Sequence, residues 1–133
     1  MTTETAAIVE IERLHAFISG WFRGEYAPDA FQSGFVDALH PEFVNIQPSG
    51  KPLTRAELLD PIRAAHGANP DFRITIEEPR VVAEYPGALI ATYVEFQQGA
   101  TNSAPENRRR STALFETGDR LVWRHLQETG LPG

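Results

Sequence analysis

The apolar residues of this 133-residue chain change their spacing part-way along it, and this change limits the possible folds more than any other feature. Before residue 66 they recur at helical spacing, whereas from Phe72 onward they alternate with polar residues, as in a half-buried strand. Residues 4–25 are predicted to form an amphipathic helix whose apolar stripe is wide enough to cover a sheet. That stripe consists of Ile8, Ile11, Leu14, Ile18, Trp21 and Phe22.

Two further helices are predicted in the first half of the chain. Residues 31–39 place Phe31, Phe35, Val36 and Leu39 on one side, and His40-Pro41 is expected to stop this helix because a residue before proline is pushed out of the helical region. Thr54 and Glu57 have the spacing of a capping box, which predicts that a third helix starts there.

The strands follow mainly in the second half. We expect a short strand at 43–47, and longer ones at 72–84, 88–98, 108–117 and 121–129. Pro79 interrupts the first of the long strands, so residues 81–84 are expected to continue it after a bulge. The order predicts one α+β domain over residues 1–133, with three N-terminal helices packed on one face of a curved, mainly antiparallel sheet.

The last of these segments alternates strictly. Regular alternation would place Leu121, Trp123, His125 and Gln127 on one face of the strand and Val122, Arg124 and Leu126 on the other. A row of rings and amides along one face is suited to lining a pocket. His125 is the best single candidate for proton transfer, because histidine titrates near neutral pH.

Composition excludes several classes of function. Twelve basic against eighteen acidic residues give a net charge of −6, which has the wrong sign for a general nucleic-acid binder. There are no cysteines, so thiolate metal sites and cysteine nucleophiles are ruled out. The histidines at 15, 40, 66 and 125 lack ligand spacing, and no phosphate-binding loop is present, so neither metal nor nucleotide cofactor is expected. Without a signal peptide or an apolar span, a cytoplasmic location is expected.

Three segments carry a resemblance to a known family: Leu39-His40-Pro41-Glu42-Phe43-Val44 with Pro48-Ser49-Gly50, Thr54-Arg55-Ala56-Glu57-Leu58-Leu59, and residues 121–129. Together they resemble the nuclear-transport-factor-2-like (NTF2-like) superfamily, which has a cystatin-like fold and includes SnoaL-type polyketide cyclases and ketosteroid isomerases. The resemblance implies a conical pocket between the bent sheet and the helices, and a homodimer packed through the sheet. It implies no particular activity, because one fold hosts many functions.

The candidate residues fall into two groups. The proposed catalytic residues are His125, Tyr93 and Glu95, the last two sharing a strand face by alternation. The proposed ligand-binding residues are Trp123, Gln127, Asn45, Trp21, His15 and Arg110, the last as a carboxylate holder at the pocket mouth. The alternative for each is a structural role in the core, in a strand or on a solvated edge. A ketosteroid isomerase needs a carboxylate base and an oxyanion hole made of a tyrosine and a protonated acid, and no motif in this chain locates these three groups.

Two hypotheses follow. In the first, the chain binds a small apolar organic ligand without a cofactor and acts as a lyase or isomerase of the cyclase type, moving a proton. In the second, it is a non-catalytic dimerisation or carrier module with a vestigial pocket. Which strand face lines the pocket is uncertain beyond the irregularity at Pro79, since a one-residue slip exchanges the two faces.

Overall fold

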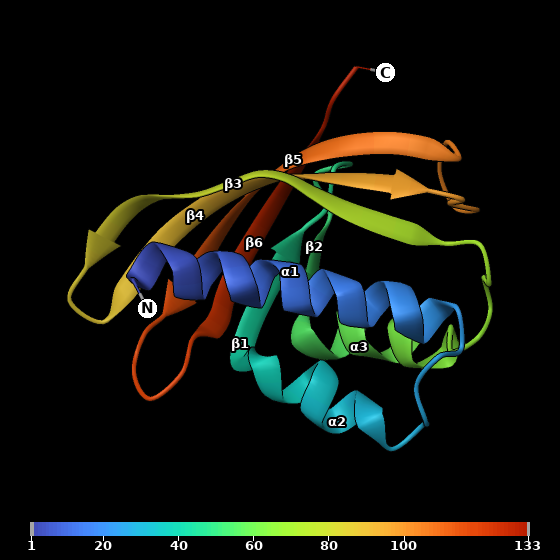
Figure 1. Ribbon diagram of the computed structural model, residues 1–133, viewed down its shortest axis with the longest axis horizontal. Coiled ribbons are helices and arrows are strands. Elements are labelled where there is room, and N and C mark those ends of the chain that lie inside the picture. Colours follow the sequence, from blue (N-terminus) through green and yellow to red (C-terminus); the bar gives the residue numbers. More distant parts are fainter. Residues whose placement is uncertain (1, 133) are drawn as a thin grey trace.

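The computed structural model describes residues 2–132 and has a layer of helices on one side of a curved sheet (Figure 1). The helical segments are α1 (Thr3–Phe22), α2 (Ala30–Gly34), the 3₁₀ turn η1 (Val36–Ala38) and α3 (Arg55–Ala64). The strands are β1 (Leu39–Ile46), β2 (Pro52–Thr54), β3 (Arg73–Tyr85), β4 (Ala88–Gln98), β5 (Glu106–Glu116) and β6 (Val122–Gly130). This confirms the predicted α+β class and its helix-covered sheet.

The six strands form one open sheet in the order β2-β1-β6-β5-β4-β3. All neighbours are antiparallel except β1 and β6, which run parallel and bring the two halves of the chain together at the middle of the sheet. Helix α1 packs mainly against β3, and α3 packs against β1 and β2. The space enclosed by these two helices and the central strands holds the core.

The first helix forms because its apolar stripe is buried against the sheet and its ends are capped. The hydroxyl of Thr2 accepts a hydrogen bond from the Thr5 amide at the N-terminus. The helix ends at Phe22, three residues before the predicted end, and Gly24 then takes a positive φ of 78° that leads the chain away.

The second predicted helix is divided. Helix α2 ends at Gly34 and a 3₁₀ turn follows, yet all four side chains predicted to be buried there are buried: Phe31, Phe35, Val36 and Leu39. His40 and Pro41 do not stop a helix but lie inside strand β1, whose start the sequence prediction placed too late. The capping box of Thr54 and Glu57 is confirmed, with both of its reciprocal hydrogen bonds present.

Strand β3 contains the predicted bulge. Its pairing with β4 shifts register between Glu77 and Arg80, around Pro79, and Glu78 adopts a positive φ of 51°. The strand then continues to Tyr85, which confirms the prediction that residues 81–84 extend it. Such a bulge bends a strand and increases its twist, so β3 curves around α1.

Strand β6 also contains a bulge, at Arg124, and it overturns the strict alternation predicted for this strand. Phe115 pairs with Trp123, but the preceding residue Leu114 pairs with His125, so the extra residue Arg124 exchanges the two faces. Trp123 therefore faces the helices, whereas His125 faces the opposite side. Leu126 and Glu128, not His125 and Gln127, share the buried face with Trp123.

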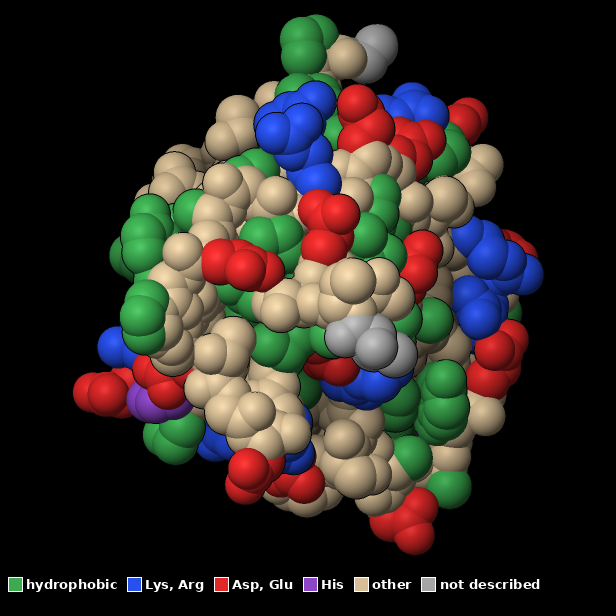
Figure 2. Space-filling view, turned by 60° about the vertical axis from the view of Figure 1, so that its left-hand side comes forward, with side chains coloured by type: hydrophobic (Ala, Val, Ile, Leu, Met, Phe, Trp, Pro, Cys, Tyr) green, Lys and Arg blue, Asp and Glu red, His purple; other side chains and the backbone are tan. Residues whose placement is uncertain are grey.

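The described part of the chain contains no helix that combines the length and the apolarity needed to cross a bilayer. On the face shown in Figure 2, acidic and basic side chains are interspersed and surround smaller apolar areas.

Candidate functional site

A cavity of about 170 Å³ lies between α1, α3 and the concave face of the sheet. Most of its wall is apolar and comes from helices and strands on opposite sides of the core. The apolar lining consists of Leu14, Ile18, Phe22, Phe35, Leu39, Phe43, Leu58, Ile62, Phe72, Ile74, Trp123 and Leu126. The polar lining consists of His15, Asn45, Gln47, Glu95, Gln97, Arg109 and Glu128. We call this cavity the inner chamber.

A buried histidine–carboxylate pair lies on one side of the inner chamber. His15, on α1, donates from Nδ1 to the Ile11 carbonyl at 2.8 Å, which directs its other nitrogen toward the sheet. That nitrogen, Nε2, is 3.2 Å from Oε1 of Glu95 on β4 and 3.4 Å from the Tyr93 hydroxyl. The His15 and Glu95 side chains are only 4% and 7% exposed, so water screens their interaction very little.

A chain of polar contacts leads from this pair to a second carboxylate, Glu128. Gln97 donates to Oε2 of Glu95 at 2.6 Å, and Asn107 donates to Gln97 at 3.2 Å. Arg109 then donates to Asn107 at 3.2 Å and to Oε1 of Glu128 at 3.5 Å.

The network closes on strand β1. Asn45 donates from one amide nitrogen to Oε2 of Glu128, at 3.1 Å, and to the Leu126 carbonyl, at 3.3 Å. Polar side chains from α1, β4, β5, β6 and β1 therefore form one connected group inside an apolar core. Buried polar groups are costly unless satisfied, so a group of this size needs a reason beyond packing.

The two partners of the histidine pair shift each other's pKa in opposite directions. Burial favours neutral His15, but the charge of Glu95 and its hydrogen bond outweigh burial and raise the His15 pKa above its usual value. Burial likewise acts to raise the pKa of Glu95, but His15, Arg109 and the hydrogen bond from Gln97 lower it to about 2. The pair is therefore an imidazolium–carboxylate ion pair at mildly acidic pH.

Glu128 is in the opposite electrostatic situation. Burial and the charge of Glu95 raise its pKa, and together they outweigh Arg109 and Asn45, which favour its ionised form. The pKa of Tyr93 is also raised, by burial and by both carboxylates, so its phenol stays protonated at neutral pH. The chamber therefore holds one carboxylate that stays ionised at neutral pH and one whose protonated form is favoured by its surroundings.

The inner chamber continues into a wider groove at the surface, of about 580 Å³. The groove lies between α3, the turn after β1 and the loop that joins β4 to β5. Seven residues line both spaces: Phe22, Gln47, Leu58, Ile62, Phe72, Gln97 and Arg109. We call this space the outer groove, and Gln47, Gln97 and Arg109 are the polar groups at its junction with the chamber.

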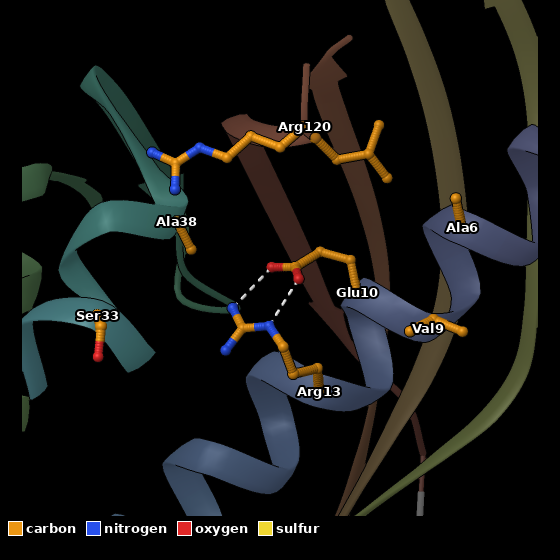
Figure 3. Close-up of a pocket in the computed structure, with 8 residues that line it drawn as sticks. Ala6, Val9, Glu10, Arg13, Ser33, Ala38 and Arg120 are labelled. Carbon is orange, nitrogen blue, oxygen red and sulfur yellow. Dashed lines mark hydrogen bonds and ion pairs between the residues drawn. The ribbon is translucent and has the colours of Figure 1, made fainter. Parts of the chain in front are cut away.

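A third hollow, on the other side of Trp123, is lined by fewer polar side chains than the inner chamber. It is lined by residues including Ala6, Val9, Glu10 and Arg13, and Figure 3 shows the Glu10 carboxylate bound by the Arg13 guanidinium. The two contacts are 2.7 and 2.9 Å, and Trp123 donates from its indole nitrogen to the same carboxylate at 2.9 Å. Glu10 thus anchors Trp123 from behind and fixes the ring that lines the chamber.

Comparison with solved structures identifies the family. No protein-family model matches the chain. A crystal structure of an NTF2-like protein of unknown function from Pseudomonas aeruginosa shares 30% sequence identity with it, and the match covers 96% of this chain and 99% of that one with a TM-score of 0.87. The chain belongs to the NTF2-like superfamily. This confirms the resemblance drawn from its sequence.

Two further matches are more distant. A proposed ketosteroid isomerase from Shewanella frigidimarina covers 93% of this chain and 94% of its own, with a TM-score of 0.67 and 16% identity, which supports the fold alone. A probable sucrose-phosphatase from Arabidopsis thaliana is 27% identical over 126 residues, or 90% of this chain. The chain spans only 29% of the length of that relative.

The fold of this chain brings together four of the residues that were predicted to form the site. Asn45, His15, Glu95 and Trp123 all line the inner chamber. Tyr93 lies directly behind them, fully buried, with its hydroxyl near His15.

The remaining predicted residues lie elsewhere. His125 and Gln127 face the outer side of the sheet because of the bulge at Arg124, and His125 borders a shallow hollow with Leu114 and Glu116. Arg110 is on the outer face as well, in an exposed ion pair with Glu78. Trp21 is packed in the core, where its indole nitrogen donates to the Ile62 carbonyl at 2.8 Å.

Three important chamber residues were missed by the sequence reasoning: Glu128, Arg109 and Gln97. One signal for Glu128 was present, because Trp123 and Leu126 are three residues apart and both apolar, a spacing that regular alternation cannot place on one face. Arg109 was considered with its neighbours, but its directly paired residue in β4, Glu95, could only be known from the strand register.

Proposed function

We propose that this NTF2-like chain binds a small organic molecule in the inner chamber and moves a proton on it with Glu128. The reaction class would be a cofactor-free isomerisation or lyase reaction. In an isomerisation, Glu128 takes a proton from a carbon next to a carbonyl group and returns it to another atom of the same molecule. In a lyase reaction, the electron pair of the broken C–H bond forms a C=C bond while the leaving group departs from the neighbouring carbon with its own electron pair, and Glu128 then passes the proton to the leaving group or to water.

The contrast between Glu95 and Glu128 is the observation that carries this proposal. Two carboxylates in one cavity whose pKa values are shifted in opposite directions are typical of an acid/base site. Glu95 stays ionised because His15 and Arg109 compensate its charge, and that charge in turn raises the pKa of Glu128. A carboxyl with a raised pKa is better matched to proton transfer near neutral pH.

Hydrogen bonding also favours Glu128 as the group that reacts. Both ring nitrogens of His15 and both carboxylate oxygens of Glu95 already have close partners. Glu128 has one firm partner, Asn45, and a long 3.5 Å contact to Arg109. A ligand can therefore approach Oε1 of Glu128 without breaking a short hydrogen bond.

The chamber walls limit what can bind. A volume of about 170 Å³ is that of about five or six waters in the liquid, so only a small group fits inside and the rest of a larger ligand would extend into the outer groove. The apolar walls favour a hydrocarbon or ring portion, with polar anchors at one side.

Deuterium exchange tests the proposal without knowledge of the natural substrate. The protein is incubated in D₂O with a panel of small cyclic and acyclic ketones, and ¹H NMR follows the hydrogens next to the carbonyl. We expect faster exchange than in buffer for at least one compound, at only one of its two prochiral hydrogens, because a fixed base reaches one face.

The second candidate is a carrier without catalysis. It is favoured by the small chamber volume and by Glu128 being held already by Asn45. If compounds bind in the chamber but exchange no faster than in buffer, the carrier function is correct and proton transfer by Glu128 is wrong.

A further inference from the structure

We propose that the ligand is a small monocarboxylic acid whose carboxylate binds Arg109, with its apolar part inside the inner chamber. This inference rests on the proposed function and adds the chemical class of the ligand. The sequence placed a carboxylate-binding arginine at the pocket mouth but chose Arg110, whereas Arg109 is the residue that lines the cavity.

The position of Arg109 suits this role. It lines both the inner chamber and the outer groove, so a ligand that occupies both spaces lies next to this side chain. Its side chain is 18% exposed, which leaves the charge accessible but mostly out of water. Hydrogen bonds to a charged group are strong in such a setting.

The guanidinium also has unused hydrogen-bonding capacity. Among residues 2–132, its buried Nε atom has no hydrogen-bond partner, and its contact to Glu128 is long, at 3.5 Å. Arginine has five N–H donors in a planar fork that matches a carboxylate. An unpaired buried donor is unfavourable, and a ligand carboxylate would satisfy it.

The charges inside the chamber indicate what else must happen when an anion binds. With His15 protonated, two cations (His15 on α1 and Arg109 on β5) balance two carboxylates (Glu95 on β4 and Glu128 on β6). Asn45 on β1 contacts Glu128 but is neutral. A ligand carboxylate adds one negative charge, so we expect Arg109 to turn its free donors to the ligand while Asn45 keeps its hydrogen bond to Glu128, which stays ionised as the base.

Calorimetry on matched pairs of probes tests the ligand class. The pairs are benzoate with benzamide and hexanoate with hexanamide, which share shape and differ in charge. The titrations are run at about pH 6, which lies above the ordinary carboxyl pKa of about 4.3, so the acids are ionised. We expect an acid to bind at least about tenfold more tightly than its amide.

Variants assign the effect to one side chain. Arg109→Gln should abolish the preference for the acid, and Arg109→Lys should keep only part of it, because lysine has no fork. The control is Arg108→Gln, which removes the same charge from the outer face, where Arg108 pairs with Glu77. It should keep the preference.

Three results would overturn the inference. An acid that binds no better than its amide contradicts it while leaving the chamber as a binding site. A preference that survives in Arg109→Gln, or that disappears equally in Arg108→Gln, shows that Arg109 does not recognise the carboxylate. If neither acids nor amides bind but a ketone of the exchange panel does, the ligand class is wrong and the proposed function stands; if no compound of either set binds, both are wrong.

Discussion

Replacing Glu128 by glutamine should lower the rate of deuterium exchange by at least about a hundredfold, the usual contribution of a positioned general base. Glutamine has nearly the same shape as glutamate and still accepts the hydrogen bond from Asn45, but its amide cannot accept a proton near neutral pH. The exchange assay with the best ketone of the panel measures the effect. Binding of that ketone should change little, so the loss appears in the rate of the chemical step.

A matched control keeps this result specific. Glu12 lies on the exposed side of α1, and Glu12→Gln makes the same chemical change away from the chamber. Its exchange rate should equal that of the wild-type protein. An unchanged rate in Glu128→Gln would remove Glu128 from the proposed mechanism.

The largest expected effect on stability follows from breaking the pair of His15 and Glu95. Glu95→Gln leaves a buried imidazolium without its counter-ion, and breaking such a pair costs about 3–5 kcal/mol. Urea unfolding at about pH 6 should show this loss in the free energy of unfolding. At about pH 8.5 the loss should be smaller, because His15 then escapes the penalty by giving up its proton.

The double variant His15→Gln with Glu95→Gln provides the test of this interpretation. It removes both charges, so it should be more stable at about pH 6 than Glu95→Gln alone. If the double variant loses the sum of the two single effects at both pH values, the two side chains are not coupled as an ion pair.

The pH dependence of stability in the wild-type protein follows from the same shifts. The His15 pKa is raised on folding, so its contribution is complete below the unfolded pKa of about 6.5 and is lost as pH rises through the folded pKa. The Glu95 pKa is lowered, so its contribution is present above about pH 4.3 and is lost as pH falls toward about 2. Glu128, with its raised pKa, destabilises the fold as pH rises above about 4.3.

Sequence reasoning succeeded where the physical signal is local. The capping box at Thr54 and the bulge at Pro79 each depend on residues close together in the chain, and both are present. The buried face of α1 was predictable because six apolar residues share one helical stripe. Residues 52–54 gave no strand signal, because three residues are too few to show a period.

The site was harder to predict because it depends on strand register. A single extra residue, Arg124, exchanges the faces of the residues that follow it in β6 relative to Trp123, and no turn residue marks the bulge. His125 was therefore preferred to Glu128, although the apolar Leu126, three residues after Trp123, already indicated that the regular alternation is broken between them. The contact of Arg109 with Glu128 depends on the register between β5 and β6, and its pairing with Glu95 on the register between β5 and β4, which one sequence does not contain.

The homodimer implied by the family resemblance stays a prediction. The outer face of the sheet, which the helices leave uncovered, carries Ile90, Phe96 and Leu114 among polar residues. The location of the protein in the cell is likewise an expectation only.

The measurement that tests the central claim most directly is a titration of the glutamate carboxyl carbons by ¹³C NMR, with Glu95→Gln and Glu128→Gln used to assign the two signals. The central claim is that one cavity holds two carboxyl groups whose pKa values are shifted in opposite directions. We predict that Glu95 titrates far below the ordinary value of about 4.3 and that Glu128 titrates above it. Two carboxyls that both titrate near the ordinary value would contradict the division of roles between them.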